Sequence, residues 1–306
     1  MKPRIVVVGS FNSDLVTYME RLPQVGETVS AREFTTWPGG KGSNQAVAAA
    51  RLGADVTLVA RIGQDSFADI GMALWKREGI NTQYVVPDPD NNTGLATIYV
   101  EDSGEDMIVV TGGANLALRP SDVDAALSAI DGADVLLTQL EIPLETVAHA
   151  LQVARKRRVR TILNPAPAIP LPSQIAALAD YLTPNETELQ TLTGKHGYAI
   201  EEHAAAMLVT VEQTAIVTVG AGGALWVNKI GHGHVPGFPV EAVDTVGAGD
   251  AFSAGLAVAL AEGRSLPDAI AFANAAAAIC VTRPGASPSM PRRYEVDALL
   301  RSQSSS

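Results

Sequence analysis

Short, uninterrupted runs of apolar residues recur along the chain and alternate with longer amphipathic segments. The apolar runs lie at 5–8, 56–60, 135–137, 161–163 and 215–219. A run without polar alternation is typical of a strand buried on both faces, as in a parallel sheet. Helical periodicity marks the segments at 42–52, 66–78, 121–130, 144–157 and 186–192. This alternation predicts an α/β fold in which helices cover a central, mostly parallel sheet.

Two segments depart from this pattern and predict a second, smaller sheet. Residues 27–37 hold β-branched clusters at 28–30 and 34–36, and residues 94–110 contain two strands around a polar turn. We expect them to form a small antiparallel sheet that covers a cleft as a lid. The predicted division assigns 11–37 and 93–111 to the lid, and 1–10, 38–92 and 112–306 to the main α/β domain. The C-terminal third predicts two Ala-rich and Gly-rich helices, at 250–262 and 267–281.

Composition narrows the classes of protein and partner. Of the 306 residues, 47% are hydrophobic and 18% charged, which suits a buried core. The net charge of −11 argues against a nucleic-acid partner, because phosphate backbones require clustered Lys and Arg. The single cysteine, Cys280, excludes an internal disulfide and fits a reducing compartment. No apolar run approaches the roughly 18 residues of a membrane span, so we expect a cytoplasmic protein with no membrane partner.

The segment 244–250 reads Asp-Thr-Val-Gly-Ala-Gly-Asp and carries the strongest chemical signal. A strand-like stretch at 240–243 precedes it, and a helix is predicted to begin near Gly249. Free N–H groups at a helix N-terminus bind anions, and the small residues Gly247, Ala248 and Gly249 let a phosphate approach. Asp250 in the first turn then suits the base of a phosphoryl transfer. The alternative is that Asp250 merely caps the helix.

Two further segments predict hydroxyl binding. In the stretch 37–45, Lys41 precedes Gly42 and the first glycine of a Walker loop is missing, so this is not a P-loop. Lys41 and Asn44 there offer donors to sugar hydroxyls, although the glycines alone also fit a hinge. Asn12 and Asp14 follow the first strand, where open α/β sheets bind ligands. They suit bidentate hydrogen bonds to hydroxyls, and the alternative is a pair of Asx-turn residues.

Weaker signals concern other acidic, amide and imidazole side chains. Glu141 follows the predicted strand 135–137 and is expected to face the same cleft. Asn185 and Glu188 lie three apart on one helical face and can steer hydrated Mg²⁺, unless Glu188 is an ordinary first-turn acid. His232 and His234 lack a third metal ligand nearby. The chain has neither the G-x-S-x-G elbow of hydrolases nor the dinucleotide fingerprint of nicotinamide dehydrogenases.

Taken together, these motifs resemble the ribokinase (PfkB) family of sugar kinases. The segment 39–46 resembles the first family signature and 244–252 the second, while 164–168, 183–188 and 282–286 match flanking strings of its ribose kinases. The resemblance runs from Gly9 to about Ser289. It implies a three-layer ribokinase-like fold with a β-sheet lid through which members often dimerise. It also implies ATP as phosphoryl donor, with Mg²⁺ and an activating K⁺.

The resemblance also implies roles for individual residues. The sugar-binding positions are Asn12, Asp14, Gly40, Lys41, Asn44 and Glu141, with Asp250 as the base and Gly247, Ala248 and Gly249 as the anion hole. The nucleotide positions are Asn185, Thr218, Gly220, Gly223 and Asn274, to which Glu188 and Gly249 are added from the patterns above. The K⁺ positions are Asp244, Val246, Cys280, Arg283, Gly285 and Ser289, acting largely through backbone carbonyls. Asn274 stands where some members have His, and Gly247 where some have Ala.

The expected reaction is therefore phosphorylation of the 5-hydroxyl of D-ribose by ATP, with Asp250 as general base. A second hypothesis keeps the kinase but changes the acceptor to another sugar, a deoxy sugar, a sugar acid or a nucleoside. A third is a sugar-binding protein without catalysis, which the intact anion-hole turn and Asp250 oppose. A sugar and ATP are the expected partners, together with a second copy of the chain.

Overall fold

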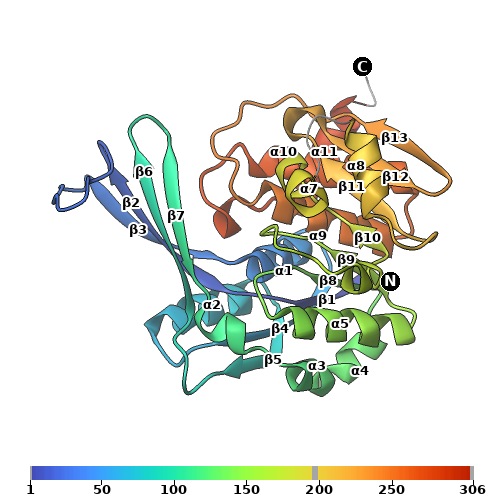
Figure 1. Ribbon diagram of the computed structural model, residues 1–306, viewed down its shortest axis with the longest axis horizontal. Helices are drawn as coiled ribbons and strands as arrows, with labels where there is room; N and C mark the ends of the chain where they lie inside the picture. Colours follow the sequence, from blue (N-terminus) through green and yellow to red (C-terminus); the bar gives the residue numbers. More distant parts are fainter. Residues whose placement is uncertain (1, 195–198, 304–306) are drawn as a thin grey trace.

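A nine-stranded sheet forms the centre of the computed structural model, which describes residues 2–194 and 199–303 (Figure 1). Its strands are β1 (Arg4–Val8), β4 (Asp55–Ile62), β5 (Asn81–Pro87), β8 (Val135–Thr138), β9 (Arg160–Leu163), β10 (Tyr181–Leu182), β11 (Thr214–Thr218), β12 (Ala224–Asn228) and β13 (Gly231–Val235). The order is β13-β12-β11-β10-β9-β8-β1-β4-β5, and all pairs from β11 to β5 are parallel. The hairpin β12–β13 adds two antiparallel strands at one edge. The predicted α/β class is confirmed.

Helices cover both faces of this sheet and bury alternate sides of its strands. One face carries α1 (Lys41–Arg51), α2 (Ser66–Arg77), α9 (Ala248–Ala261), α10 (Leu266–Cys280) and α11 (Arg293–Gln303). The other carries α3 (Pro120–Ala125), α4 (Leu127–Asp131), α5 (Leu144–Lys156), α6 (Ser173–Ala176), α7 (Glu186–Thr193) and α8 (Ile200–Met207). In β1, Ile5 and Val7 face the first group, while Val6 and Val8 face the second. Burial on both faces explains why the strand sequences show no polar alternation.

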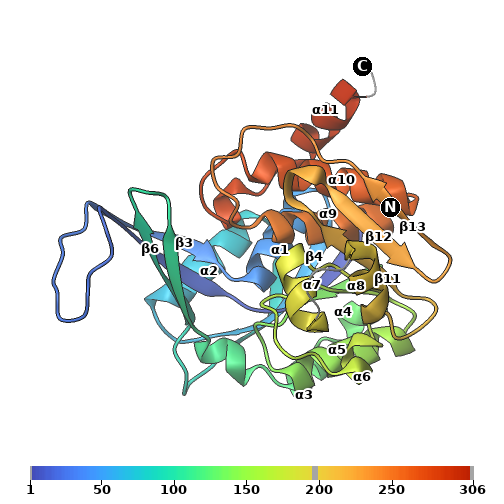
Figure 2. The same cartoon turned by 45° about the horizontal axis from the view of Figure 1, so that its top comes forward.

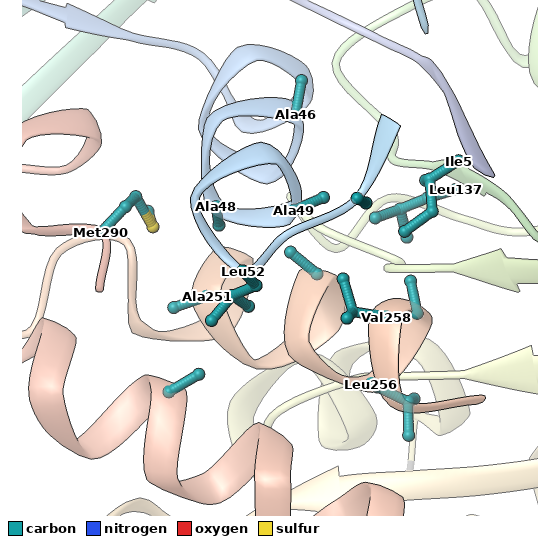
Figure 3. Close-up of a cluster of buried hydrophobic side chains, with 14 of the residues drawn as sticks. Ile5, Ala46, Ala48, Ala49, Leu52, Leu137, Ala251, Leu256, Val258 and Met290 are labelled. Atoms are coloured by element: carbon teal, nitrogen blue, oxygen red, sulfur yellow. The ribbon is translucent and has the colours of Figure 1, made fainter. Parts of the chain in front are cut away.

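Helices α1 and α9 pack directly against each other through small side chains (Figure 3). Ala48 and Ala49 of α1, and Leu52 directly after it, belong to the same buried cluster as Ala251 and the rest of the α9 face. Small residues let helix backbones approach closely, and close-packed interiors deform little. The N-termini of these two helices, which carry the two predicted signatures, are therefore held in a fixed relation.

The lid is a separate four-stranded sheet that projects from the main domain (Figure 2). Its strands are β2 (Asn12–Met19), β3 (Glu33–Gly39), β6 (Gly94–Glu101) and β7 (Asp106–Thr111), in the order β3-β2-β6-β7. The sheet is mixed, so the prediction of an antiparallel lid is wrong: β2 and β6 pair in parallel, starting from the pair Asn12 and Gly94. Both strands leave the main domain at this base and run outward, which forces the parallel arrangement.

Other differences from the sequence predictions have local causes. Residues 28–30 and 240–243 are loops although their β-branched content favoured strands. The predicted helix 121–130 is divided into α3 and α4, with Ala126 between them at φ −92° and ψ 9°. Within residues 2–194 and 199–303, three short 3₁₀ segments occur, at η1 (Gly113–Ala117), η2 (Gly220–Gly222) and η3 (Ser287–Ser289). Residues 1, 195–198 and 304–306 of the predicted main domain lie outside the described residues, and the predicted domain boundaries stay a prediction.

No helix within residues 2–194 and 199–303 combines the length and the apolar character needed to cross a membrane.

Candidate active site

The predicted hydroxyl-binding residues converge on one cavity of about 570 Å³ between the lid and the carboxyl ends of the central strands. All seven line it: Asn12, Asp14, Gly40, Lys41, Asn44, Glu141 and Asp250. A hydrogen bond of 3.0 Å from Asn44 Nδ2 to Asp250 Oδ2 joins the starts of α1 and α9, which lie 206 residues apart in the chain. The two strongest sequence segments therefore form one site.

Asn12 and Asp14 lie on the first lid strand, so the Asx-turn alternative is wrong. Asn12 Oδ1 accepts a hydrogen bond of 2.8 Å from Asn115 Nδ2, which leaves the Asn12 amide nitrogen to donate into the cavity. Asp14 is buried, and burial, followed by the nearby charges of Glu141 and Asp250, raises its pKa to about 7. Buried groups with such a perturbed pKa are typical of ligand sites.

Glu141 braces the beginning of α1. Its Oε2 accepts hydrogen bonds from the Lys41 amide, at 2.9 Å, and from the Ser10 hydroxyl. An anion at a helix N-terminus is stabilised by the free amides and the helix dipole. Gly40 precedes this helix at φ 82°, and a Cβ there would lie 2.5 Å from the Asn12 nitrogen, so only glycine fits. Burial alone would lower the pKa of the Lys41 ammonium, but Asp250, Glu141 and Glu188 raise it overall, which keeps it charged.

The start of α9 supplies both a carboxylate and free amides. Gly247 is the N-cap at φ 82°, and the first intrahelical bond runs from Ala251 N to Gly247 O at 2.9 Å. The amides of Gly249 and Asp250 consequently have no carbonyl partner within the helix. The predicted anion hole is only partly open, because the Ala248 amide donates to Thr245 O at 3.3 Å. Asp250 is the third helical residue and forms no cap, so that alternative is wrong.

The carboxylate of Asp250 is buried and fixed at both oxygens. Oδ2 accepts from Asn44 Nδ2 at 3.0 Å, and Oδ1 accepts from Gln45 Nε2 at 2.9 Å. Burial raises the pKa of Asp250, while Lys41, Asn44 and Gln45 act in the opposite direction. A carboxylate with a raised pKa beside an alcohol-sized cavity is suited to accept a proton near neutral pH.

A second cavity of about 280 Å³ lies on the other side of the same turn. It is lined by Thr218, Gly220, Gly223, Gly249 and Asn274 of the predicted nucleotide positions, along with apolar side chains such as Phe238 and Phe252. Ala248 and Gly249 face this cavity, whereas Gly247 and Asp250 face the first. The turn 247–250 is thus a wall shared by both cavities.

Asn185 and Glu188 stand apart from the two cavity linings. They form a reciprocal cap of α7, with bonds of 2.7 Å from Glu188 N to Asn185 Oδ1 and 2.9 Å from Asn185 N to Glu188 Oε2. These contacts fit the alternative interpretation, in which Glu188 is an ordinary acidic residue in the first turn of a helix. Asn185 also pairs with Thr218, which lines the nucleotide cavity. Burial raises the pKa of Glu188, and the charge of Glu188 interacts electrostatically with Lys41 and Asp250. Their predicted Mg²⁺ role stays a prediction.

The six predicted K⁺ positions lie on two segments that Asp244 ties together. Asp244 Oδ1 accepts from Val246 N at 2.9 Å, and Oδ2 accepts from Gly285 N at 2.7 Å. The Cys280 thiol lies 3.0 Å from Ser289 Oγ. The pKa of this thiol is raised to about 11, mainly by burial, so the thiol is neutral. The Arg283 side chain pairs with Glu295 instead. No group of three or more His, Cys, Asp or Glu side chains placed to hold a metal ion occurs in the described residues, and the predicted K⁺ positions stay a prediction.

Several site residues carried no sequence signal. Asn115 binds Asn12, and it also fixes Phe11 by accepting from its amide at 2.9 Å and donating to its carbonyl at 2.9 Å. Lid side chains also line the sugar-side cavity, namely Ala96, Ile98, Ile108 and Val110. Alternation within 95–101 and 107–110 indicates which lid residues share a face, but only the fold shows that this face meets Asp250.

Comparison with known proteins places this site in a family. The family model described as pfkB family carbohydrate kinase matches residues 2–293. The chain is 42% identical over 296 residues to the ribokinase of Bacillus subtilis, covering 97% of this chain and 99% of the relative. It is 40% identical over 291 residues to the deoxyribokinase of Salmonella typhi, covering 94% and 95%. The structure of Arabidopsis thaliana ribokinase complexed with ribose and ATP superposes with a TM-score of 0.91 at 35% identity, covering 98% and 99%.

Proposed function

The chain belongs to the PfkB family of carbohydrate kinases, phosphotransferases with an alcohol acceptor, and on this premise we propose that it transfers the γ-phosphoryl group of ATP to the 5-hydroxyl of D-ribose. The observation that carries the proposal is the shared wall at 247–250. Asp250, which carries the carboxylate, lines one cavity, and Gly249, whose amide has no carbonyl partner within the helix, lines the other. Phosphoryl transfer requires this order of base, migrating group and nucleotide along one line.

The proposed mechanism assigns the proton to Asp250. The cavity-side oxygen, Oδ2, accepts the proton of the primary hydroxyl while the hydroxyl oxygen attacks the γ-phosphorus. The amides of Gly249 and Asp250 stabilise the negative charge that develops on the transferred group, and the Lys41 ammonium adds a fixed positive charge. The lid strands cover the acceptor and exclude water that would otherwise hydrolyse ATP.

Two metal ions belong to this proposal. Mg²⁺, when bound, neutralises the β- and γ-phosphate charge, and we assign its hydrated shell to the vicinity of Asn185 and Glu188. K⁺, when bound, would be held by the predicted positions on the segments 244–246 and 280–289, and it would supply positive charge beside the anion-hole turn. In this proposal, proton transfer is assigned to Asp250 and stabilisation of the transferred group to the helix amides, so the ions contribute through their charge.

Ribose is favoured over deoxyribose by the polar groups in the cavity. Asn12 and Asp14 line the sugar-side wall and offer a donor and an acceptor to hydroxyl groups, and a sugar that lacks a hydroxyl would leave such a buried group unpaired. A penalty of this kind reaches several kcal/mol when the group is charged. The deoxyribokinase relative keeps 2-deoxyribose as the second candidate acceptor.

A coupled assay of ADP release tests the function. The enzyme is supplied with ATP, Mg²⁺ and either ribose, 2-deoxyribose, fructose or a nucleoside, with and without K⁺. The proposal predicts the highest kcat/KM for ribose and a further increase with K⁺. A higher kcat/KM for 2-deoxyribose or a nucleoside would show that the acceptor is not ribose. Calorimetric binding of ribose without ADP release would show that the protein binds the sugar and does not phosphorylate it.

We also propose a homodimer that packs the lid sheets of two copies, in a cytoplasmic setting that suits one reduced, buried cysteine. Met107 and Val109 of β7 are about half exposed, and Phe34 of β3 is 61% exposed. Their neighbours Ile108 and Val110 line the sugar-side cavity, so β7 is apolar on both faces. An apolar strand at a sheet edge is unfavourable in water and favours a partner.

A further inference from the structure

Three buried amide side chains form a chain of hydrogen bonds behind Asp250. Gln45 and Gln139 are fully buried, and Asn164 is 4% exposed. Gln45 Nε2 donates to Asp250 Oδ1 at 2.9 Å and to Asn164 Oδ1 at 3.1 Å. Gln45 Oε1 accepts from Gln139 Nε2. Within the described chain none of the three lines either cavity, so they do not touch the sugar or the nucleotide.

The orientation of these amides is fixed by a backbone carbonyl. Asn164 Nδ2 donates to Thr183 O at 2.9 Å, and a carbonyl oxygen can only accept. Asn164 must therefore turn its own oxygen toward Gln45, which in turn must present its nitrogen. Both N–H groups of Gln45 are thus directed at acceptors, one of which is the Asp250 carboxylate. Gln139 completes the arrangement by donating to the remaining oxygen of Gln45.

We infer that Gln45, oriented by Asn164 and Gln139, is a positioning residue that binds Oδ1 of Asp250 and so directs Oδ2 toward the acceptor hydroxyl. The inference rests on the proposed role of Asp250 as base. Oδ2 is bound by Asn44, which lines the sugar-side cavity, whereas Oδ1 points toward groups that do not. The carboxylate is thereby fixed in rotation, with one oxygen on the protein side and one on the substrate side.

A purely structural role explains these residues less well. The amide oxygen of Gln139, Oε1, is buried and has no hydrogen-bond partner among the described residues. An unpaired buried polar group costs stability, so an apolar side chain of the same shape would serve the fold better. The same oxygen lies 2.2 Å from the position of a Cβ on Gly9, so the chain also keeps a glycine to admit it. The amides are retained at a cost, which fits a catalytic requirement.

The charged groups around Asp250 come from several elements. Lys41 of α1 favours the ionised carboxylate, while Glu141 disfavours it. Asp14 of β2, Glu188 of α7 and Cys280 of α10 also interact with its charge. The hydrogen bond from Gln45 acts in the same direction as Lys41 and lowers the pKa of Asp250 against the effect of burial. Loss of this bond must therefore raise the pKa further.

The first test measures stability and does not depend on catalysis. Gln45→Met keeps the length of the side chain and removes the amide, and Gln213→Met is the matched control. Gln213 is a buried glutamine that donates to the carbonyls of Ala176 and Ala179 and accepts from the amides of Val209 and Thr210, none of which titrates. Thermal unfolding of both variants and the wild type is followed at pH 5 and pH 8.

The expected stability result follows from the protonation of Asp250. Its folded pKa is raised above the ordinary 3.8, so the ionised form that needs Gln45 is more populated at pH 8 than at pH 5. The loss of Tm in Gln45→Met is therefore larger at pH 8, whereas the loss in Gln213→Met is the same at both. Equal losses in Gln45→Met at the two pH values would overturn the inference, whether or not the protein is a kinase.

The second test uses steady-state kinetics with ribose and ATP. Gln45→Met is expected to lower kcat about ten- to a hundredfold through misplacement of the base, with the KM for ribose nearly unchanged. The acid limb of kcat/KM moves up by about one pH unit, the scale of a hydrogen bond to a charged acceptor. Gln139→Met, which removes only the orienting donor, shifts the limb in the same direction by less. It also serves if Gln45→Met does not fold.

The outcomes separate this inference from the proposed function. An unshifted acid limb in both variants, with wild-type kcat, would reject the positioning role while leaving the kinase intact. A wild-type protein that phosphorylates no sugar would reject the proposed function, and the pH-dependent unfolding would still report whether Gln45 holds the carboxylate.

Discussion

At the scale of single residues, the chemistry depends on one carboxylate held by two amides. Asp250 is buried at the start of α9, and Asn44 and Gln45 donate to its two oxygens. Burial raises its pKa, which brings a carboxylic acid closer to the pH at which it exchanges a proton with an alcohol. Its environment, rather than its identity alone, makes it a base.

Replacement of this carboxylate tests its role directly. Asp250→Asn keeps the size of the side chain but cannot accept the proton, so kcat should fall at least about a hundredfold. At pH 8 the removal of a buried charge favours the folded state, whereas the asparagine amide nitrogen must face the donor of Asn44 or of Gln45 and forfeits one hydrogen bond, so a loss of Tm is expected to be small. ADP release and thermal unfolding measure the two effects, and a kcat near that of the wild type would remove Asp250 from this role.

Asp14 links sugar binding to pH. Burial, Glu141 and Asp250 raise its folded pKa to about 7, above the ordinary 3.8. The folded state thus takes up a proton, and the contribution of Asp14 to stability falls as pH rises from about 4 to about 7. Asp14→Asn removes this loss, so its advantage in Tm over the wild type should grow across that window and then level off. Its KM for ribose should rise, because an amide replaces a charged acceptor.

Thermal unfolding between pH 4 and pH 8 checks this prediction. A difference in Tm between Asp14→Asn and the wild type that stays constant with pH would contradict the raised pKa.

At the scale of elements, two glycines that lie two residues apart at the start of α9 have different roles, one in backbone conformation and one in ligand access. Gly247 has φ 82°, and a Cβ there would lie 3.0 Å from Met290 Cε and 3.2 Å from Ala286 Cα. Alanine at this position is therefore more costly than its small size suggests. At Gly249 a Cβ would meet nothing within 4 Å, yet the residue lines the nucleotide cavity.

The two alanine variants should therefore behave in opposite ways. Gly247→Ala should lose about 1–2 kcal/mol of stability, the cost of a left-handed conformation for an L residue. Gly249→Ala should keep the wild-type Tm but raise the KM for ATP and lower kcat, because its methyl group occupies the approach to the amides. Unfolding and kinetics of the pair decide the matter. A Gly249→Ala enzyme with unchanged kinetics would show that phosphate does not approach that amide.

The sequence pattern located the central strands closely, because a strand buried on both faces requires an uninterrupted apolar run, which few other structures produce. The runs at 5–8 and 135–137 fall within β1 and β8. The stretch 240–243 misled because its valines lie on an exposed loop, with Val243 64% exposed. Hairpin β12–β13 carries glycine and histidine that weaken any strand signal. Local patterns fail where partners distant in sequence decide the structure.

The residues of the site fall into the same two groups: those in local motifs were predicted from the sequence, and those that depend on distant contacts were not. Signatures around Lys41 and Asp250 were visible because each is a local motif at a helix start. Asn115 and Gln139 were not, since their roles come from contacts 103 and 94 residues away, with Asn12 and Gln45 respectively. No spacing within one segment encodes such a contact.

At the scale of the whole molecule, the lid has two tasks that use opposite faces of one strand. Ile108 and Val110 line the sugar-side cavity, Met107 and Val109 alternate with them along β7, and all four are about half exposed. We expect Val109→Glu to convert a dimer into a monomer in light scattering, because burial of a charge in an apolar interface is unfavourable. Val211→Glu, at a valine of the main domain that is 66% exposed, provides the matched control away from the lid. A wild-type protein that is monomeric at micromolar concentration would contradict the lid dimer.

The central claim is that the wall at 247–250 places an alcohol on Asp250 and a phosphate on the amides of α9. A crystal structure with ribose and a non-hydrolysable ATP analogue tests it most directly. We predict the ribose O5 within about 2.6–3.2 Å of Asp250 Oδ2, with the terminal phosphate against the Gly249 amide. A carboxylate turned away from the bound sugar, or a phosphate remote from the helix start, would contradict the account.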